Sequence, residues 1–306
     1  MRTLFASVFV AAFCAFGFAA ASAQPAATFK SAVDVVPISV VVHDGRGRMI
    51  TTLRAADFEV LDKGERRPIL TFQTDDTSPI TLAVVVDVSG SMRLSSKLTY
   101  AREVVRRLAM NLEDGRDEVG LFTFDDALHE QQAFTSHPAS LDGALSHADP
   151  WGVTSLYDAI AETARRLATR PASRRAIVVI TDGIDTSSTM TPPEVSALAS
   201  GIDAPVYVVA TGPRIDRAGY LERTTSHAAG KSADLQDLAA WTGGDIVWVS
   251  GADDAAVRAF QILTELRHQY LIAIDSAVEG DWRPIDVRVR DRHLTVRARS
   301  GYFSKH

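Results

Sequence analysis

The chain has 306 residues, of which 46% are hydrophobic and 23% are charged, and its formal net charge is −6. This length allows one large globular domain together with a smaller one, and the composition is ordinary for a globular protein. The mild acidity excludes the basic surface on which binding of nucleic acid or of an anionic membrane depends.

The first residues have the pattern of a secretory signal peptide. Arg2 gives a positive start, an apolar run covers residues 4–20, and residues 21–23 form an Ala-Ser-Ala cleavage pattern. We therefore expect residues 1–23 to be removed and the protein to be exported, to the periplasm or the medium, without a stable membrane anchor. A transmembrane anchor is the alternative, but the run is rich in alanine and no basic cluster follows it. Removal would take away Cys14, the only cysteine, so no disulfide could form.

Residues 24–79 have the pattern of a β segment. Strand-like apolar stretches cover residues 33–42, 58–61 and 69–72. The Asp-Lys-Gly sequence at 62–64, between the second and third stretches, is typical of a hairpin turn.

Residues 80–265 alternate strands with helices. Short runs that are almost entirely apolar, which suit strands covered on both faces of a parallel sheet, occur at 81–86, 175–180, 205–210 and 246–249. Residues 119–124 also predict a strand, which turns at Asp125-Asp126 and returns through 128–134 as an antiparallel edge. The alternation predicts an α/β fold with a doubly wound, mostly parallel sheet and one antiparallel edge strand.

Apolar residues at helical spacing lie between these strands. One such stripe comprises Leu94, Leu98, Ala101, Val105, Leu108 and Leu112, and another comprises Val257, Phe260, Leu263 and Leu266. Each stripe predicts a helix that packs on the sheet.

Residues 266–306 show a period-two alternation of apolar and charged residues. Ile285, Val287 and Val289 alternate with charged residues, which indicates half-exposed antiparallel strands. A few hairpins at either end of a chain are not stable alone. We therefore expect residues 24–79 and 266–306 to pack together as a small β-sandwich with the α/β domain inserted in it. Three separate units are the alternative.

Three segments of the α/β region carry hydroxyls and carboxylates. Asp87, Ser89 and Ser91 follow the first apolar strand, Asp182 follows the second, and Thr154 lies in a loop that opens a helix. The carboxyl ends of parallel strands meet at one edge of a sheet, where ligands bind. Two carboxylates placed close together repel unless a cation or a proton lies between them. Oxygen ligands favour Mg²⁺, Mn²⁺ or Ca²⁺.

Each of these residues also has a purely structural interpretation. Asp87, Ser89, Ser91 or Thr154 could cap a helix, and Asp182 could fix a turn with the glycine that follows it. Their joint occurrence in three segments favours the metal site.

The same residues resemble the metal-ion-dependent adhesion site of von Willebrand factor A domains. The resemblance consists of Asp-x-Ser-x-Ser at 87–91, Thr154 within Gly-x-Thr-Ser-Leu-Tyr-Asp-Ala, and Thr-Asp-Gly at 181–183, and it covers residues 80–265. The flanking sequences Phe-Glu-Val-Leu-Asp-Lys-Gly and Glu-Leu-Arg-His-Gln-Tyr-Leu-Ile resemble an exported bacterial subgroup of such proteins. The resemblance implies a Rossmann-like domain.

The resemblance also implies a role for each residue. Ser89 and Ser91 would bind the cation through their hydroxyls, Asp87 and Asp182 directly or through water, and Thr154 in the binding-competent state. One coordination position would remain for an Asp or Glu carboxylate of a protein partner. Mg²⁺ is the first expectation for the cation, with Mn²⁺ and Ca²⁺ as alternatives.

The sequence therefore predicts a cation-dependent protein-binding module and not an enzyme. A metal-assisted phosphohydrolase with Asp87 as nucleophile is one alternative, but Ser89 stands where a second aspartate would be expected. A structural envelope protein with an incidental metal site is another. The long polar segment at 213–231 predicts either a recognition loop or a mobile insertion at the same edge.

Overall fold

A computed structural model describes residues 35–74, 76–171, 174–212, 234–275 and 282–303. The expected signal peptide at 1–23 and the polar segment at 213–231 lie outside these residues. Among the described helices, none is long and apolar enough to cross a membrane.

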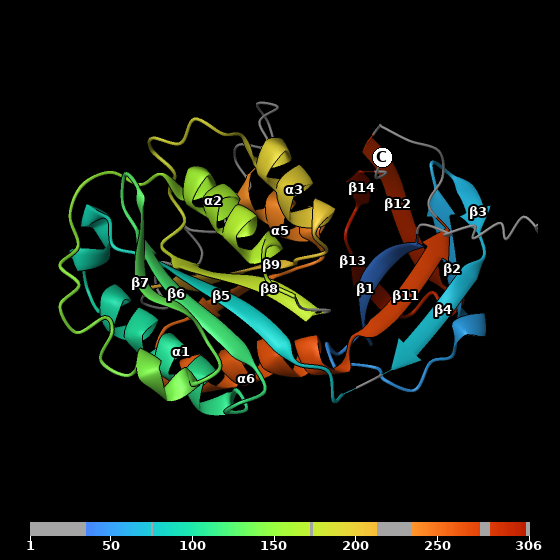
Figure 1. Cartoon of the computed structure of the whole chain (residues 1–306), viewed down its shortest axis with the longest axis horizontal. Coiled ribbons are helices and arrows are strands. Elements are labelled where there is room, and N and C mark those ends of the chain that lie inside the picture. The colour runs from blue at the N-terminus through green and yellow to red at the C-terminus, as the bar shows by residue number, and fades with distance from the viewer. Residues whose placement is uncertain (1–34, 75, 172–173, 213–233, 276–281, 304–306) are drawn as a thin grey trace, which may run out of the picture. The chain divides into compact units, whose positions relative to one another are not determined.

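A six-stranded sheet forms the centre of the α/β region (Figure 1). Its strands, in spatial order, are β10 (Ile246–Val249), β9 (Val206–Thr211), β8 (Arg174–Thr181), β5 (Ile80–Asp87), β6 (Glu118–Phe124) and β7 (Leu128–Thr135). Neighbouring strands are parallel except for β6 and β7, which are antiparallel. The predicted α/β fold with a mixed sheet and an antiparallel edge strand is confirmed.

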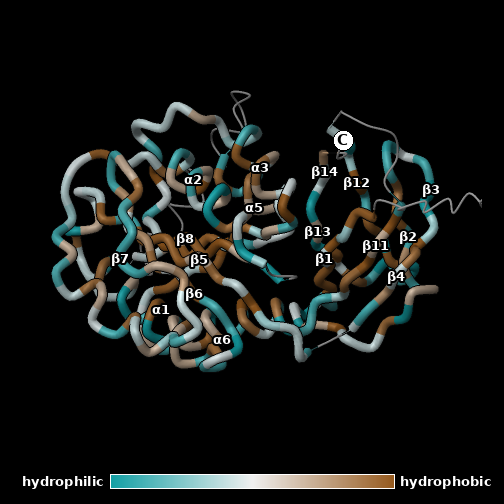
Figure 2. The backbone as a smooth tube through the Cα atoms, in the orientation of Figure 1, coloured by the Kyte–Doolittle hydropathy of each residue, from teal (hydrophilic) through white to brown (hydrophobic). Residues whose placement is uncertain are grey.

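Helices cover both faces of this sheet (Figure 1). Helices α1 (Lys97–Asn111) and α6 (Ala252–His268) pack on one face, and α2 (Leu156–Ala168), α3 (Pro192–Gly201) and α5 (Leu235–Thr242) on the other. Strand β5 is buried at every position, and its successive residues belong alternately to the two apolar clusters. Figure 2 shows hydrophobic residues concentrated in these central strands.

The buried faces of two helices differ from the predicted stripes. Val257 and Phe260 of α6 are 60% and 61% exposed, and Leu94 lies before α1 and is 64% exposed. The residues of α6 that face the sheet are Ala255, Ala259, Ile262, Leu263 and Leu266. Alanine suits this face because its small side chain lets the helix approach the sheet closely, and the predicted stripe did not include these alanines.

Two antiparallel sheets are built from the two ends of the chain. One contains β13 (Thr295–Ala298), β1 (Val35–His43), β11 (Tyr270–Asp275) and β4 (Ile69–Thr74), and the other contains β14 (Gly301–Phe303), β12 (Trp282–Val289), β2 (Phe58–Asp62) and β3 (Glu65–Arg67). A single apolar cluster draws residues from both sheets, among them Ile38, Tyr270 and Val287. The strands of the two ends therefore associate as predicted, whereas the domain boundaries at residues 80 and 265 stay predictions.

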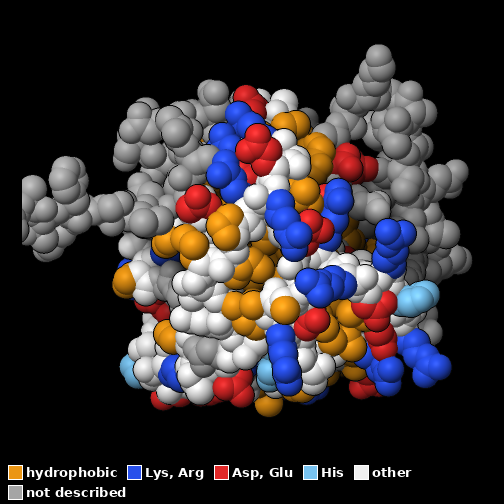
Figure 3. Space-filling model, turned by 90° about the vertical axis from the view of Figure 1, so that its right-hand side faces the viewer, with side chains coloured by type: hydrophobic (Ala, Val, Ile, Leu, Met, Phe, Trp, Pro, Cys, Tyr) orange, Lys and Arg blue, Asp and Glu red, His pale blue; other side chains and the backbone are white. Residues whose placement is uncertain are grey.

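The remaining described elements are three short 3-10 helices, η1 (Ala55–Asp57), η2 (Gly90–Arg93) and η3 (Pro138–Leu141). On the molecular face of Figure 3, Lys and Arg side chains lie among Asp and Glu and among apolar side chains.

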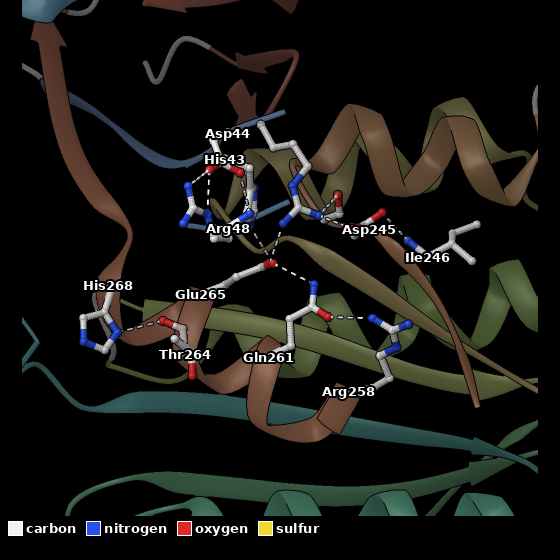
Figure 4. A network of polar contacts seen from close by, with 12 residues as sticks. His43, Asp44, Arg48, Asp245, Ile246, Arg258, Gln261, Thr264, Glu265 and His268 are labelled. Carbon is white, nitrogen blue, oxygen red and sulfur yellow. Dashed lines mark hydrogen bonds and ion pairs between the residues drawn. The ribbon is translucent and has the colours of Figure 1, made fainter. Parts of the chain in front are cut away.

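A buried ion network joins α6 to the antiparallel sheets (Figure 4). Glu265 of α6 is 2% exposed and forms an ion pair with Arg297 of β13. Its carboxylate also lies 3.2 Å from His43 Nε2 of β1 and accepts a hydrogen bond from Gln261. Burial acts to raise the pKa of Glu265, but the hydrogen bond with His43 and the charge of Arg297 outweigh it and lower the pKa. The ionised carboxylate is therefore the stable form.

Arg297→Met should destabilise the protein strongly, because it leaves the Glu265 carboxylate buried without its guanidinium partner. Breaking a buried ion pair on one side costs about 3–5 kcal/mol. Arg288→Met is the matched control, since Arg288 pairs with Asp286 where both side chains are more than half exposed. Losing an exposed pair should cost less than about 1 kcal/mol. Urea unfolding measures both variants, and equal losses would contradict a stabilising role of the buried network.

Candidate metal centre

The predicted ligands lie at the carboxyl edge of the central sheet. Strand β5 ends at Asp87, and the neighbouring parallel strand β8 ends at Thr181, directly before Asp182. The sheet therefore delivers both carboxylates to one edge, as the sequence predicted.

Asp87 is held by hydrogen bonds to both of its carboxylate oxygens. It has no exposed surface. Oδ1 accepts a hydrogen bond of 2.8 Å from the Ser89 backbone N–H, and Oδ2 accepts one of 2.6 Å from the Thr181 hydroxyl. Burial raises the pKa of Asp87 to about 6, although these hydrogen bonds act to lower it, and the charge of Asp182 raises it further. The ionised form of the Asp87 carboxyl group is therefore unfavourable in this buried position, and a nearby cation would stabilise it.

A buried side chain and a backbone hydrogen bond hold the Ser89–Ser91 turn in place. The Ser89 and Ser91 hydroxyl oxygens lie 3.2 Å apart. Met92 is fully buried in the apolar cluster under the turn. The Gly90 N–H donates to the carbonyl of Gly152 over 3.1 Å, which joins this turn to the loop that carries Thr154.

Thr154 is 4% exposed, and its backbone is bound to the loop after Asp182. Its N–H donates to the Thr186 hydroxyl over 2.9 Å, and its carbonyl accepts from the N–H groups of Thr186 and Ser187. The three predicted segments are therefore connected to one another by hydrogen bonds.

Among the residues considered as caps, Ser89 stands at the N-cap of η2, where it makes no side-chain capping hydrogen bond. Ser96 precedes α1 and Ser155 precedes α2 at the N-cap positions. Asp185 accepts a hydrogen bond of 2.9 Å from the Leu156 N–H at the start of α2. Helix capping therefore does not explain Asp87 or Thr154. Sequence reasoning missed Asp185, although its place three residues after Asp182 put it in the right loop.

The two carboxylate oxygens of Asp182 have different surroundings. It is 7% exposed, and its Oδ2 accepts a hydrogen bond of 2.7 Å from Lys97 Nζ. Its Oδ1 is buried and has no hydrogen-bond partner among the described residues. An unsatisfied buried carboxylate oxygen is unfavourable. The donor set is made of carboxylates and hydroxyls, which suit a hard divalent ion. The residues therefore fit the predicted cation.

A second polar group lies at the β6–β7 turn. Ligand atoms of Asp125, Asp126 and His129 come within 4.8 Å of one another. Asp125 and His129 already form a contact of 3.1 Å with each other, and Asp126 and His129 are exposed. The sequence had placed Asp125 and Asp126 in a turn between two strands, which agrees with the structure.

Exposed apolar side chains lie close in sequence to the predicted ligands. They are Leu94 (64% exposed), Trp151 (73%), Val153 (49%) and Ile184 (44%), and they lie on the three loops described above. The Arg93 guanidinium carbon lies 5.9 Å from the centre of the Trp151 ring, so the first two loops also meet at the surface. We call these four residues the apolar rim.

Residues 82–185 match the family model of the von Willebrand factor type A domain. This part of the chain is similar to a von Willebrand factor type A domain. The matched residues run from β5 to the loop after Asp182, and all five predicted ligands lie within them. No curated protein sequence matches the chain significantly.

Several solved structures are similar to the chain. The conserved hypothetical protein BatB from Bacteroides thetaiotaomicron is 20% identical, with 61% of this chain and 98% of that chain covered and a TM-score of 0.48. A von Willebrand factor type A protein from Catenulispora acidiphila is 12% identical, with 78% and 75% covered and a TM-score of 0.48. The von Willebrand factor domain of the type V pili tip protein Mfa5 from Porphyromonas gingivalis is 23% identical, with 37% and 40% covered and a TM-score of 0.32.

The raised pKa of Asp87 predicts a pH effect on the chelator-treated protein. Because the folded-state pKa of about 6 exceeds the ordinary aspartate pKa of 3.8, the folded state binds this proton more tightly than the unfolded state. The destabilisation is fully present above pH 6 and is lost as the pH falls towards 4. Asp87→Asn should therefore stabilise the protein at pH 7.5 relative to its effect at pH 4, by roughly 3 kcal/mol. Urea unfolding at both pH values measures this, and a pH-independent difference would contradict it.

Proposed function

We propose that this protein is an exported protein-binding module that depends on a divalent cation, and that it is not an enzyme. The observation that carries the proposal is the buried Asp182 Oδ1, which lacks a hydrogen-bond partner among the described residues. It belongs to a loop that hydrogen bonds connect to the loops of Ser89 and Thr154. Export rests on the signal-peptide pattern at residues 1–23 and implies a periplasmic or secreted location.

In this proposal Ser89 and Ser91 bind the cation through their hydroxyls, and Thr154 joins them in the binding-competent state. Both oxygens of Asp87 already accept hydrogen bonds, which supports contact through water. Asp182 offers its free oxygen directly. Mg²⁺ is the proposed cation, with Mn²⁺ and Ca²⁺ as alternatives.

The charge balance supports a carboxylate as the partner group. Asp87 and Asp182 together carry two negative charges, which only neutralise a divalent ion. Hydroxyls and waters add no charge, so the bound ion stays attractive to an Asp or Glu of the partner. The apolar rim then contacts the partner around that residue, because exposed apolar side chains gathered at one place mark protein-interaction surfaces. The partner should present an acidic side chain flanked by apolar ones.

The phosphohydrolase alternative is not favoured by the geometry. Asp87 would be the nucleophile, yet it has no exposed surface and both of its oxygens are engaged. A phosphoryl group could not reach it without opening the loops. No observation favours the structural-protein alternative over the binding module.

Titration calorimetry of chelator-treated protein with MgCl₂ and MnCl₂ tests the cation. We expect the wild type to bind one ion. Asp182→Asn should bind it at least about tenfold more weakly, because asparagine carries no negative charge and has only one oxygen in place of the two carboxylate oxygens. A wild type that binds no ion at millimolar concentration would rule out the proposal.

Thr154→Val tests the binding role, since valine preserves the volume and removes the hydroxyl. Proteins captured from envelope extracts with Mg²⁺ should be lost with EDTA and also with Thr154→Val, while the melting temperature stays nearly unchanged. Thr295→Val is the matched control, because Thr295 is exposed on β13 of the antiparallel sheets and belongs to none of the loops of the site. Capture that is equal in EDTA and Mg²⁺ would argue for cation-independent binding.

A further inference from the structure

Lys97 contacts the candidate metal centre, although neither the sequence pattern nor the expected ligand set includes it. Its Nζ lies 2.7 Å from Asp182 Oδ2 and 3.4 Å from the Ser91 carbonyl oxygen. The Lys97 side chain is only 15% exposed and that of Asp182 only 7%. The ammonium group is therefore held among the residues that would bind the ion.

Lys97 is poorly placed to serve α1 itself. It is the first residue of that helix, and the first turn contains no acidic residue. A positive charge at a helix N-terminus is repelled by the helix dipole. The contact with Asp182 compensates for this unfavourable position, which indicates that the ammonium is needed by the carboxylate rather than by the helix.

The ammonium group and a divalent ion would compete for the same carboxylate. Of the two carboxylate oxygens of Asp182, Oδ2 is held by Lys97, whereas Oδ1 lacks a hydrogen-bond partner among the described residues. The two oxygens of one carboxylate are so close that a cation at Oδ1 would repel the nearby ammonium. In a site that is largely shielded from water this repulsion is strong.

We propose that Lys97 is a built-in counter-ion that stabilises the metal-free site and is displaced from Asp182 when the divalent cation binds. This inference rests on the proposed function and adds a regulatory element to it. Lys97 lowers the affinity of the site for the ion, so that the module becomes competent for binding only where the ion is abundant. Its long aliphatic stem on the surface end of α1 lets the ammonium move into solvent without unfolding the helix.

Lys97→Met tests the proposal, because methionine keeps much of the length and removes the charge. In calorimetry with MgCl₂ or MnCl₂, the variant should bind the ion roughly tenfold or more tightly than the wild type. Lys97→Arg should bind like the wild type, since the charge is kept. Lys63→Met is the control, because Lys63 lies exposed in the β2–β3 turn. Without ion, Lys97→Met should melt at a lower temperature, and Mg²⁺ should restore it.

A second measurement uses the wild-type protein, so it holds even if the variant folds poorly. Acylation of lysines, followed by mass spectrometry, should modify Lys97 slowly in EDTA and faster in Mg²⁺, while Lys63 reacts equally in both. Equal ion affinity of wild type and Lys97→Met, together with unchanged Lys97 reactivity, would overturn the counter-ion role while leaving the cation site intact. Absence of ion binding to both proteins would overturn the proposed function and this inference together.

Discussion

Asp87 is a carboxylate without exposed surface at the end of a strand that is buried along its whole length, and the surrounding loops are arranged to tolerate its charge. The neighbouring strand β8 places the Thr181 hydroxyl against one oxygen, and the turn after β5 places the Ser89 N–H against the other. Because these two contacts fix the carboxylate, they also fix the turn that follows it. The buried position of Asp87, which raises its pKa, therefore goes together with the two hydrogen bonds that order the loops at the carboxyl edge of the sheet.

A second carboxylate, that of Asp182, adds another negative charge at the same edge of the sheet. Asp182 is also buried, and its charge acts to raise the pKa of Asp87. Lys97 compensates one of these two negative charges. The proposed divalent cation would compensate both, and the apolar rim would then shield the ion from water once a partner is bound. Charge balance therefore links the buried sheet edge to the surface on which the proposed function depends.

The α/β region is also tied closely to the antiparallel sheets. The strand before it, β4, pairs with the strand after it, β11, so that Thr74 and Tyr270 are register partners. Close by, Asp117 accepts a hydrogen bond from the Ile80 N–H and forms an ion pair with Arg267 near the end of α6. The chain therefore leaves and re-enters the antiparallel sheets at one place, and Glu265 adds a buried ion pair there.

The sequence by itself determined the central strands and the identity of the candidate ligands. Apolar runs such as 176–180 favour buried strands, and Asp87 and Asp182 each come after such a run. These features depend on residues that are close in the chain, so their pattern is visible in it. Period-two alternation likewise indicated antiparallel strands near the C-terminus, and strand-like stretches with a hairpin turn indicated strands near the N-terminus. These patterns left the choice between one shared β unit and separate units open.

Only the tertiary structure decided which polar atoms meet. Lys97 and Asp182 are 85 residues apart, and no local pattern joins them. The same holds for the pairing of β4 with β11 and for the capping of α2 by Asp185. The predicted buried face of α6 was partly wrong for the same reason. Val257 and Phe260 are apolar yet exposed, whereas small alanines contact the sheet. Contacts of this kind depend on the fit of whole elements against each other, and that fit is not written in any short stretch of sequence.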